Sequence, residues 1–150
     1  MLAVVQIIAS GSVSLEGNAD TNRKSGQGLL VFLGVSKTDT PSEVEKISQK
    51  LLKLRVFPDS DQKMNLDIKQ INGEILLISQ FTLFGNLKGN NRPDFTAAAD
   101  KALATNLYEL FADKLTSAGI PTTKGYFGEH MAIKADFIGP VTIILDSEKL

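Results

Sequence analysis

Two short segments that lie far apart in the sequence carry the residues best suited to chemistry. The first is Ser79–Thr82 (Ser-Gln-Phe-Thr), which places two hydroxyls and an amide at the end of an apolar run, just before a loop rich in glycine and asparagine. The second is Gly139–Thr142 (Gly-Pro-Val-Thr). Hydroxyl side chains at a strand end can satisfy neighbouring backbone groups or line a binding site. Their types alone leave both interpretations of Ser79–Thr82 open.

The residue types that are missing narrow the chemistry further. The chain has no cysteine and a single histidine, His130, so thiolate chemistry is excluded and a metal site built from several histidines is not expected. Nothing in the sequence supports a Ser-His-Asp relay, and we expect His130 to be structural and partly exposed. A site without a strong base has to work by positioning its substrate and by stabilising developing charge with fixed donors. We predict neither a metal nor a cofactor.

The two motifs, in this order, resemble those of the D-aminoacyl-tRNA deacylase (D-tyrosyl-tRNA(Tyr) deacylase) family. The resemblance extends to Gly28–Val35, Lys63–Ile68 and Asn91–Phe95 and covers essentially the whole chain. It implies a hydrolase that cleaves the ester bond of D-aminoacyl-tRNA and releases free tRNA and D-amino acid, which is a chiral proofreading activity. Gly-tRNA is a second candidate substrate.

The resemblance also implies roles for the residues of the first motif. Ser79, Gln80, Phe81 and Thr82 form the catalytic segment, which works largely through backbone groups with help from the 2′-hydroxyl of the terminal adenosine. A nucleophilic Thr82 is the competing mechanism. Phe81 would either stack on the terminal adenine, a common mode of single-strand RNA recognition, or pack in the core.

Gly139 and Pro140 resemble the family's Gly-cisPro element. In the family this dipeptide reaches into the partner subunit's site, where its carbonyls leave no room for an L side chain, so the resemblance implies a homodimer. A rigid wall of main-chain atoms rejects one enantiomer by overlap. The plainer alternative is a trans proline that ends a strand, since only about 5–6% of X-Pro bonds in folded proteins are cis. Phe127 and Met131 resemble the family's pocket-wall residues, with plain core packing as the alternative.

Two positions depart from the family pattern. The family has Gln-Arg after its opening strand where this chain has Gln6-Ile7, and Asn-Asp before Gly-Pro where this chain has Phe137-Ile138. We hypothesise that apolar packing of Ile7, Phe137 and Ile138 anchors the Gly-Pro segment. The peptide bond would then be cis with altered support, or trans beside a roomier pocket that admits small L-amino acids such as alanine.

Charge limits the partners that we expect. The formal net charge is −1, whereas proteins that bind nucleic acid non-specifically usually carry a broad basic field. Contact with RNA should therefore use a small local patch at one end of the molecule, and we expect no DNA partner. Lys88 and Arg92, which flank the loop after Ser79–Thr82, and the pair Arg23-Lys24 are candidates for phosphate contacts or are simply solvated.

The compartment is predicted from what the chain lacks. The opening segment, residues 1–10, is apolar but has no basic leader or convincing cleavage site, so it is typical of a first strand rather than a signal peptide. No apolar stretch approaches the length of a membrane span, and the absence of cysteine fits a reducing compartment. We expect a cytoplasmic protein with no membrane partner.

Several apolar runs predict strands. Leu2–Ile8 is rich in β-branched residues, and Gly28–Val35 is almost continuously apolar, as expected of a strand covered on both faces. Ser12–Leu15 should pair nearby through a turn at Gly17-Asn18. Met131–Leu145 contains strand-like runs broken by Gly139-Pro140.

A further strand should deliver the first motif. Asn72-Gly73 is typical of a tight turn that leads into the buried run Glu74–Ile78. We expect this strand to continue through Ser79–Leu83. A polar turn at Asp59–Lys63 and a loop at Gly85–Asn91 would connect the neighbouring elements.

Two helices are indicated by caps and periodicity. The first should begin at a capping box formed by Thr40 and Glu43, with Pro41 at the first helical position, and end at Phe57-Pro58. Its apolar face comprises Val44, Ile47, Leu51 and Leu54. The second should span about Lys101–Ser117 and stop at Gly119. Its buried residues would be Leu103, Leu107, Leu110, Phe111 and Leu115.

These elements predict an α+β protein. The chain is 43% hydrophobic and 22% charged, which is enough apolar material for a real core in one compact domain, residues 1–150. We expect five or six strands in antiparallel or mixed sheets that form a barrel-like core, with two main helices packed on it. Strands clustered at both ends of the chain disfavour an alternating doubly wound fold.

Two other functions compete with D-aminoacyl-tRNA hydrolysis. A divergent family member with relaxed chirality would act on small L-aminoacyl-tRNA. A non-catalytic, RNA-binding dimer would keep the fold without the reaction, although the intact Ser79–Thr82 motif disfavours it. A hydrolase of another small ester is a further candidate, and the lack of a glycine-rich phosphate loop disfavours a nucleotide substrate.

Overall fold

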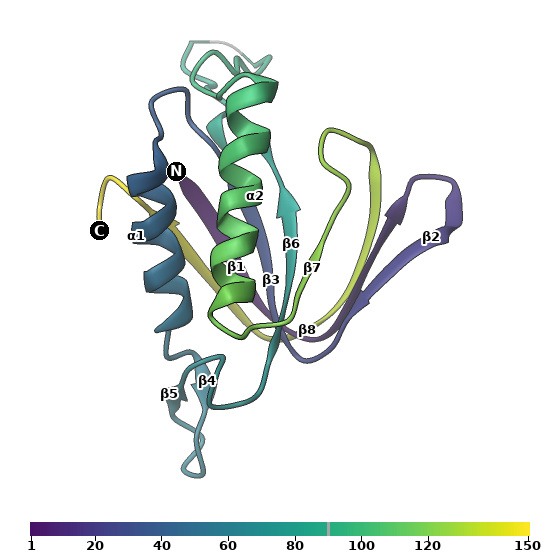
Figure 1. Cartoon of the computed structure of the whole chain (residues 1–150), viewed down its shortest axis with the longest axis vertical. Helices are drawn as coiled ribbons and strands as arrows, with labels where there is room; N and C mark the ends of the chain where they lie inside the picture. The colour runs from purple at the N-terminus through teal and green to yellow at the C-terminus, as the bar shows by residue number, and fades with distance from the viewer. Residues whose placement is uncertain (90) are drawn as a thin grey trace.

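The computed structural model describes every residue except residue 90 (Figure 1). Its elements, in chain order, are β1 (Leu2–Leu15), β2 (Asn18–Ser25), β3 (Gly28–Gly34), α1 (Pro41–Leu52), β4 (Phe57–Pro58), β5 (Met64–Leu66), β6 (Glu74–Ser79), the 3₁₀-helix η1 (Phe81–Phe84), α2 (Lys101–Ser117), β7 (Thr122–Lys124) and β8 (Met131–Asp146). None of the described helices is long and apolar enough to cross a membrane.

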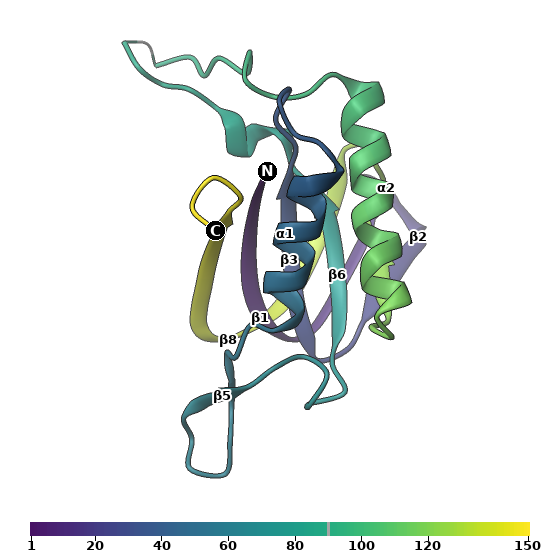
Figure 2. The same ribbon diagram turned by 60° about the vertical axis from the view of Figure 1, so that its left-hand side comes forward.

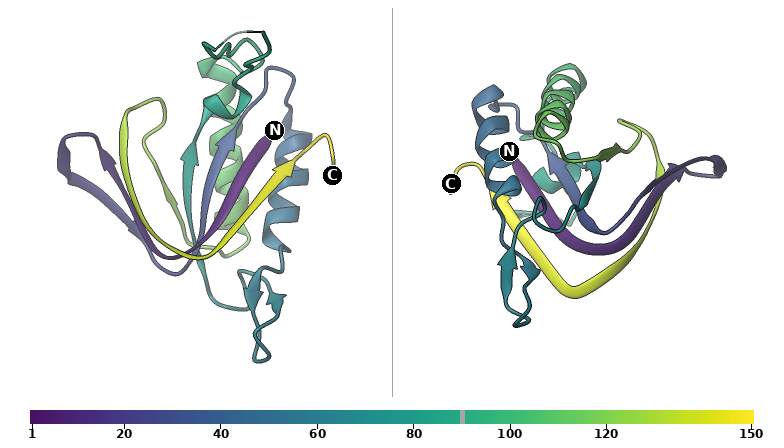
Figure 3. Two further views of the ribbon diagram at one scale, coloured as in Figure 1. Left: turned by 180° about the vertical axis from the view of Figure 1, so that it is seen from behind. Right: turned by 60° about the horizontal axis from the view of Figure 1, so that its bottom comes forward.

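One curled, mixed sheet organises the molecule. Its strand order is β2-β1-β3-β6-β7, and β8 pairs with the free side of β1. The pairs that involve β1 are antiparallel, whereas β3–β6 and β6–β7 are parallel. Strands β1 and β8 bend together through most of their length, so the sheet curls toward a barrel (Figure 3). The predicted α+β class with a barrel-like core is confirmed.

Helices α1 and α2 cover one face of the sheet (Figures 1 and 2). The helix residues Val44, Ile47, Leu51, Leu107, Phe111 and Leu115 are buried there against alternate residues of the strands, such as Val5, Val31 and Leu77. Alternation follows from the pleat, which points successive side chains to opposite faces. A second, smaller cluster lies on the other face, where Leu30, Leu76 and Ile78 pack with Ile8 and Val13 from the curled part of β1. The run Gly28–Val35 is therefore covered on both faces, as predicted.

The capping signals define the helix starts well. Thr40 accepts a hydrogen bond from Ser42 N at 3.2 Å, and Glu43 Oε2 accepts one from Thr40 N at 2.9 Å, so the predicted capping box is present. Helix α2 has the predicted bounds, and Asp100 caps it by accepting from Leu103 N at 2.8 Å.

Helix α1 ends earlier than predicted. It stops at Leu52, and Leu54 lies outside it. The residue before a proline is disfavoured in the helical region, and Phe57, which precedes Pro58, is buried and pairs with Leu66 in the β4–β5 hairpin. The chain has to leave the helix before Phe57 to reach that position.

The predicted strand through Leu83 is also wrong. Strand β6 ends at Ser79, and the chain turns at Gln80 into η1. The partner strand β3 ends at Gly34, and its last pairing with β6 joins Leu33 to Ser79. Beyond that point β6 has no neighbour with which to continue the ladder. The following loop, predicted at Gly85–Asn91, is bridged from Asn86 to Asp94, although residue 90 lies outside the described part.

Candidate active site

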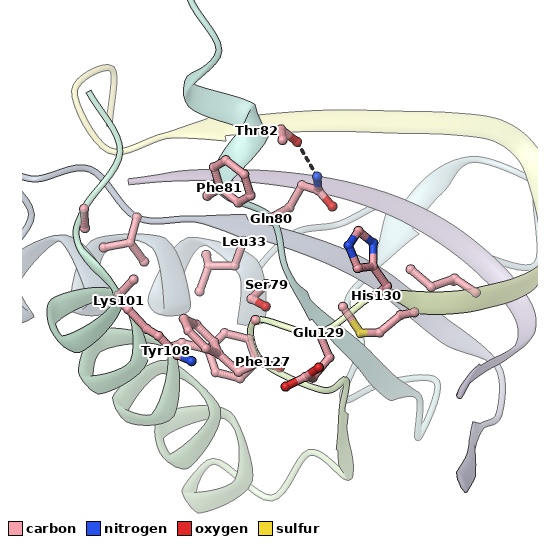
Figure 4. Close-up of a pocket in the computed structure, with 16 residues that line it drawn as sticks. Leu33, Ser79, Gln80, Phe81, Thr82, Lys101, Tyr108, Phe127, Glu129 and His130 are labelled. Atoms are coloured by element: carbon pink, nitrogen blue, oxygen red, sulfur yellow. Dashed lines mark hydrogen bonds between the residues drawn. The ribbon is translucent and has the colours of Figure 1, made fainter. Parts of the chain in front are cut away.

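A cavity of about 690 Å³ opens where β6 ends, between η1, the start of α2 and the loop that precedes β8 (Figure 4). The residues that line it are Leu33, Val35, Ser79, Gln80, Phe81, Thr82, Ala99, Lys101, Ala104, Tyr108, Phe127, Gly128, Glu129, His130, Met131 and Ile133. Six of the eight site residues expected from the sequence, all but Gly139 and Pro140, therefore lie together.

The sheet delivers the first motif to the cavity. Strand β6 runs parallel to β3, and Gln80 N donates to Leu33 O at 2.8 Å as the last bond between the two. Ser79 and Gln80 are half-buried, whereas Phe81 and Thr82 are exposed. The turn from strand to 3₁₀-helix thus brings four consecutive residues out of the core and into the wall of one cavity.

The side chain of Thr82 is engaged by its neighbour. Gln80 Nε2 donates a hydrogen bond to Thr82 Oγ1, drawn as the dashed line in Figure 4. No carboxylate or imidazole of the described residues accepts a hydrogen bond from the Thr82 hydroxyl. An activated hydroxyl nucleophile needs an adjacent base, so this arrangement does not favour nucleophilic attack by Thr82.

Two backbone donors are left open at the same turn. The first N–H groups of a helix have no partner within it, and those of Phe81 and Thr82 have no acceptor among the described residues. Both residues line the cavity. Main-chain donors of this kind are suited to stabilising a developing oxyanion.

Phe81 is available to a ligand. Its side chain is 58% exposed, and its ring meets the edge of Phe95 at 5.0 Å between centroids. Core packing, which was the alternative for this residue, is therefore wrong. An exposed aromatic face beside a cavity is suited to stacking on a base.

The opposite wall is more deeply packed. Phe127 and Met131 are half-buried and both line the cavity, so the two interpretations of them, wall and core, both hold in part. The Phe127 ring lies 5.4 Å from that of Tyr108 on α2. Burial, with a smaller contribution from Glu109, raises the pKa of the Tyr108 hydroxyl above its ordinary value, and this hydroxyl donates to Leu77 O at 2.8 Å.

The rim of the cavity carries charge that the motifs did not predict. Lys101, Glu129 and His130 are exposed and line it (Figure 4). Lys101 is the first residue of α2. Glu129 and His130 lie between the predicted wall residues Phe127 and Met131, and this position in the sequence could have indicated them. No hydrogen bond joins the His130 imidazole to Ser79 or Thr82 in the described part of the chain. A Ser-His relay is not assembled.

Gly139 and Pro140 lie elsewhere in the subunit. They sit on the outer strand β8, are exposed, and do not line the cavity. The Gly139–Pro140 peptide bond is cis, as the resemblance implied. Residues 138–141 lie opposite the single residue Ile7 of β1, which makes a bulge.

The proposed apolar anchor of this bulge is wrong. Ile7 is buried in the core on the helix side, whereas Phe137 and Ile138 are 55% and 43% exposed. Within the subunit, the contact that is present beside the bulge is a hydrogen bond from Gln6 Nε2 to Thr142 Oγ1 at 3.2 Å.

The candidate phosphate contacts also differ in their surroundings. Lys88 and Arg92 are exposed in the loop after η1 and do not line the cavity. Arg23 is also exposed, and its guanidinium donates to the backbone carbonyls of Lys124, the last residue of β7, and of Gly125. Among the described residues, no group of three or more His, Cys, Asp or Glu side chains is placed to hold a metal ion.

Comparison with known proteins agrees with this geometry. The profile of the family described as D-Tyr-tRNA(Tyr) deacylase matches residues 4–146. Proteins named D-aminoacyl-tRNA deacylase are 43% identical in Syntrophobacter fumaroxidans, over 100% of this chain and 99% of the relative, and 44% identical in Clostridioides difficile, over 99% of each.

Solved structures share the fold of this chain. A structure titled c-Myc DNA Unwinding Element Binding Protein is 38% identical, with a TM-score of 0.89 over 97% of this chain and 98% of that one. A probable eukaryotic D-amino acid tRNA deacylase has a TM-score of 0.81 over 96% and 97%, and at 18% identity it shows the fold alone. Because the profile spans nearly all of the sequence and full-length relatives exceed two-fifths identity, the chain belongs to the D-Tyr-tRNA(Tyr) deacylase family.

Proposed function

We propose that this protein hydrolyses the ester bond of D-aminoacyl-tRNA and releases free tRNA and D-amino acid. The observation that carries the proposal is the open cavity built on Ser79–Thr82 in a chain of this family. Relatives that match over their full length are named for this activity. A chain with an intact motif and an accessible cavity is better explained as an enzyme than as a binding domain that has lost the reaction.

The chemistry assigned to the cavity uses main-chain groups. Water attacks the carbonyl carbon of the aminoacyl ester, and the N–H groups of Phe81 and Thr82 stabilise the oxyanion that forms. The bond to the ribose oxygen then breaks, and that oxygen takes up the proton that the water gives up. The neighbouring 2′-hydroxyl of the substrate assists this transfer. Phe81, with its exposed ring, stacks on the terminal adenine.

A side-chain nucleophile is the weaker alternative. Thr82 Oγ1 accepts a hydrogen bond from Gln80 and has no base beside it in the described residues. Ser79 is half-buried and likewise has no hydrogen-bonded histidine or carboxylate. A mechanism that relies on substrate placement and fixed donors needs neither group to be activated.

Chirality is assigned to a second subunit. The exposed Gly139–Pro140 tip of one protomer enters the cavity of its partner, where main-chain carbonyls overlap with an L side chain and leave space for a D side chain. Its exposure and its separation from the cavity of its own subunit support this role. A twofold arrangement is the commonest way for two copies to exchange such a contact reciprocally.

The name of one similar structure raises a DNA-binding alternative. That name describes the other protein. The net charge of −1 does not provide the basic field on which DNA binding depends. The cavity is also better suited to a single stacked base than to a duplex.

The reaction is tested by following ester loss from D-Tyr-tRNA, L-Tyr-tRNA, Gly-tRNA and L-Ala-tRNA. We expect turnover of D-Tyr-tRNA and no turnover of L-Tyr-tRNA. Ala104→Trp, which fills the cavity from α2, is the matched inactive control, with its melting temperature measured to show that it folds. Turnover of L-Ala-tRNA would replace strict D-specificity by relaxed chirality, and no turnover of any substrate would leave an RNA-binding dimer as the better explanation.

The shared site is tested by mixing two inactive variants. Ala104→Trp blocks the cavity but keeps the tip, and Gly139→Ala distorts the tip but keeps the cavity. If the tip acts in the partner's cavity, subunit exchange restores roughly a quarter of wild-type activity, because half of randomly paired dimers are mixed and each mixed dimer has one intact site. No recovery after verified exchange would place the tip and cavity within one subunit.

A further inference from the structure

One wall of the cavity is a loop with little regular structure. Residues 125–130 connect β7 to β8 and supply Phe127, Gly128, Glu129 and His130 to the cavity. The loop is tied at its ends, where Gly125 N donates to Leu77 O at 2.8 Å and Glu16 N donates to His130 O at 3.0 Å. Between these points it has one internal bond, from Glu129 N to Tyr126 O at 3.2 Å. Loops with few backbone bonds open easily, so other contacts have to fix this wall.

Arg23, on the neighbouring strand β2, supplies such contacts. Its Nη1 donates to Lys124 O at 2.9 Å and to Gly125 O at 3.1 Å. Its guanidinium carbon lies 3.8 Å from the centroid of the Tyr126 ring. Hydrogen bonds from a charged donor are stronger than neutral ones, and a guanidinium stacked on a tyrosine adds a cation–π attraction.

Tyr126 is held at both ends. Its hydroxyl donates to Thr21 O at 2.5 Å, and its backbone N donates to Met131 Sδ at 3.2 Å. Thr123 Oγ1 adds a bond to Lys24 O at 3.0 Å. The β2 strand and the segment that leads to β8 therefore lie side by side (Figure 1), and Tyr126 links the strand directly to Met131 in the cavity wall.

The packing beneath Tyr126 leaves little freedom. A Cβ at Gly125 would lie 2.9 Å from both Ile78 Cδ1 and Met131 Sδ. Such a distance is shorter than real Cβ contacts, so the loop backbone at Gly125 lies close to the side chains of Ile78 and Met131. A shift of Tyr126 should consequently be passed to Met131 and Phe127 rather than absorbed by empty space.

We propose that Arg23 is a positioning residue: through Tyr126 it holds the Phe127–Met131 wall in the shape that binds the aminoacyl group. This rests on the proposed function of the cavity. The alternative role for Arg23, contact with tRNA phosphates, would have to use its other guanidinium donors, because Nη1 and the face stacked on Tyr126 are already engaged within the chain; the assays below separate the two roles. Lys24, the next residue, is exposed, and its side chain makes no hydrogen bond or ion pair with described residues.

The contrast between these two neighbours defines the experiment. Arg23→Lys keeps the charge but loses the stack and the paired donors, whereas Lys24→Ala removes a charge from the same strand. Each variant is assayed on D-Tyr-tRNA and on D-tyrosyl-adenosine, which carries the ester but no phosphates. A wall that contacts the substrate equally in ground and transition states affects KM and leaves kcat unchanged.

We expect Arg23→Lys to raise KM about tenfold on both substrates with kcat within about twofold, as loss of binding that is equal in the ground and transition states requires. Lys24→Ala should match the wild type on D-tyrosyl-adenosine. A purely structural role would instead lower the folded fraction, and hence kcat, with KM unchanged. A role in phosphate binding would leave D-tyrosyl-adenosine unaffected and would be rescued by lysine. Either result would overturn the proposal.

A second readout does not depend on activity. The chain has three methionines, so a spectrum of the protein labelled with ¹³C at the methionine methyl groups contains few signals. We expect Arg23→Lys to shift the Met131 signal and Lys24→Ala to leave it in place. If the wild type hydrolyses no substrate, the proposed function fails while this shift still decides the role of Arg23. An unchanged Met131 signal would overturn the proposal.

Discussion

The two segments to which the sequence assigns chemistry differ in their burial and in the groups that surround them. The Ser79–Thr82 turn is the end of a buried strand, bonded to β3 and enclosed by α2 and the loop before β8. The Gly139–Pro140 tip stands on the outer strand, exposed, with exposed Phe137 and Ile138 beside it. Exposed apolar side chains in a cluster mark surfaces that contact another molecule.

The difference indicates that the cavity, unlike the tip, is built from groups of a single chain. The cavity has its floor, its walls and its backbone donors in place, so substitutions there should act on chemistry or binding. The Gly139–Pro140 tip does not line the cavity of its own chain, so under the proposed function substitutions there should act through assembly with a second copy. The following predictions separate the two regions, from the largest expected effect to the smallest.

Gly139→Ala should have the largest effect. Gly139 has a φ of +123°, and an added Cβ would lie 2.5 Å from Val141 N. The tip must therefore shift, and a misplacement of about 1 Å near a reacting centre can cost about 100-fold in rate. We expect kcat/KM on D-Tyr-tRNA to fall by that factor. Gly17→Ala, the same change at positive φ in an open turn, is the control, and equal activities of the two variants would assign the whole reaction to one subunit.

The double variant Phe137→Ser/Ile138→Ser should weaken assembly. Full burial of a Phe or Ile side chain contributes about 1.5–3 kcal/mol, and a loss of about 2 kcal/mol corresponds to roughly a 30-fold rise in dimer Kd. Sedimentation across a dilution series measures it. Met64→Ser, which removes a side chain that is 60% exposed on β5, should leave the Kd unchanged. A monomeric wild type would refute the assignment of these residues to an interface.

Thr82→Ala should have a modest effect on catalysis. The variant loses the hydrogen bond from Gln80 but keeps the backbone N–H groups. We expect kcat to fall about fivefold, the equivalent of about 1 kcal/mol for one hydrogen bond. Loss of an essential nucleophile costs on the order of 10⁶-fold, so single-turnover rates distinguish the mechanisms clearly. Thr116→Ala, which removes a hydroxyl bonded to Ala112 O on α2, is the matched control.

Tyr108→Phe should be the mildest change. It removes the buried hydroxyl that donates to Leu77 O and leaves the ring against Phe127. Unfolding in denaturant should show a loss of about 1 kcal/mol, the usual net contribution of one such hydrogen bond, with kcat/KM within about twofold. A much larger loss of activity would mean that the floor of the cavity takes part in the reaction.

The sequence predicted best what depends on near neighbours. The capping box at Thr40 and the bounds of α2 were correct because caps and apolar spacing are local signals. The continuation of β6 through Leu83 was wrong because a strand ends where its neighbour ends, and the length of β3 is not visible from residues 79–83. The anchor of Ile7, Phe137 and Ile138 failed because apolar type alone does not reveal whether a side chain is buried, and Phe137 and Ile138 are exposed.

The residues that line the cavity were predicted in part, and those at its rim were missed. The resemblance placed Ser79–Thr82, Phe127 and Met131, and all of them line one cavity. Lys101 and Tyr108 reach the cavity only because α2 packs across the end of β6, a long-range contact that no short motif encodes. The contacts of Arg23 with Lys124 and Tyr126 also join residues far apart in the sequence. The charge of Arg23 alone suggested phosphate binding.

The pairing of β1 with β8 has a consequence for how the chain folds. Strand β1, the first in the chain, pairs along one edge with β8, the last, from Leu2↔Asp146 to Leu15↔Met131. Contacts between residues so distant in sequence slow folding. During synthesis, β1 can pair with β2 and β3, but its other edge remains unpaired until β8 leaves the ribosome, and such edges promote aggregation. Early release of an unfinished chain should thus be more damaging than slow completion, and the nascent protein is expected to depend on chaperones that shield β1.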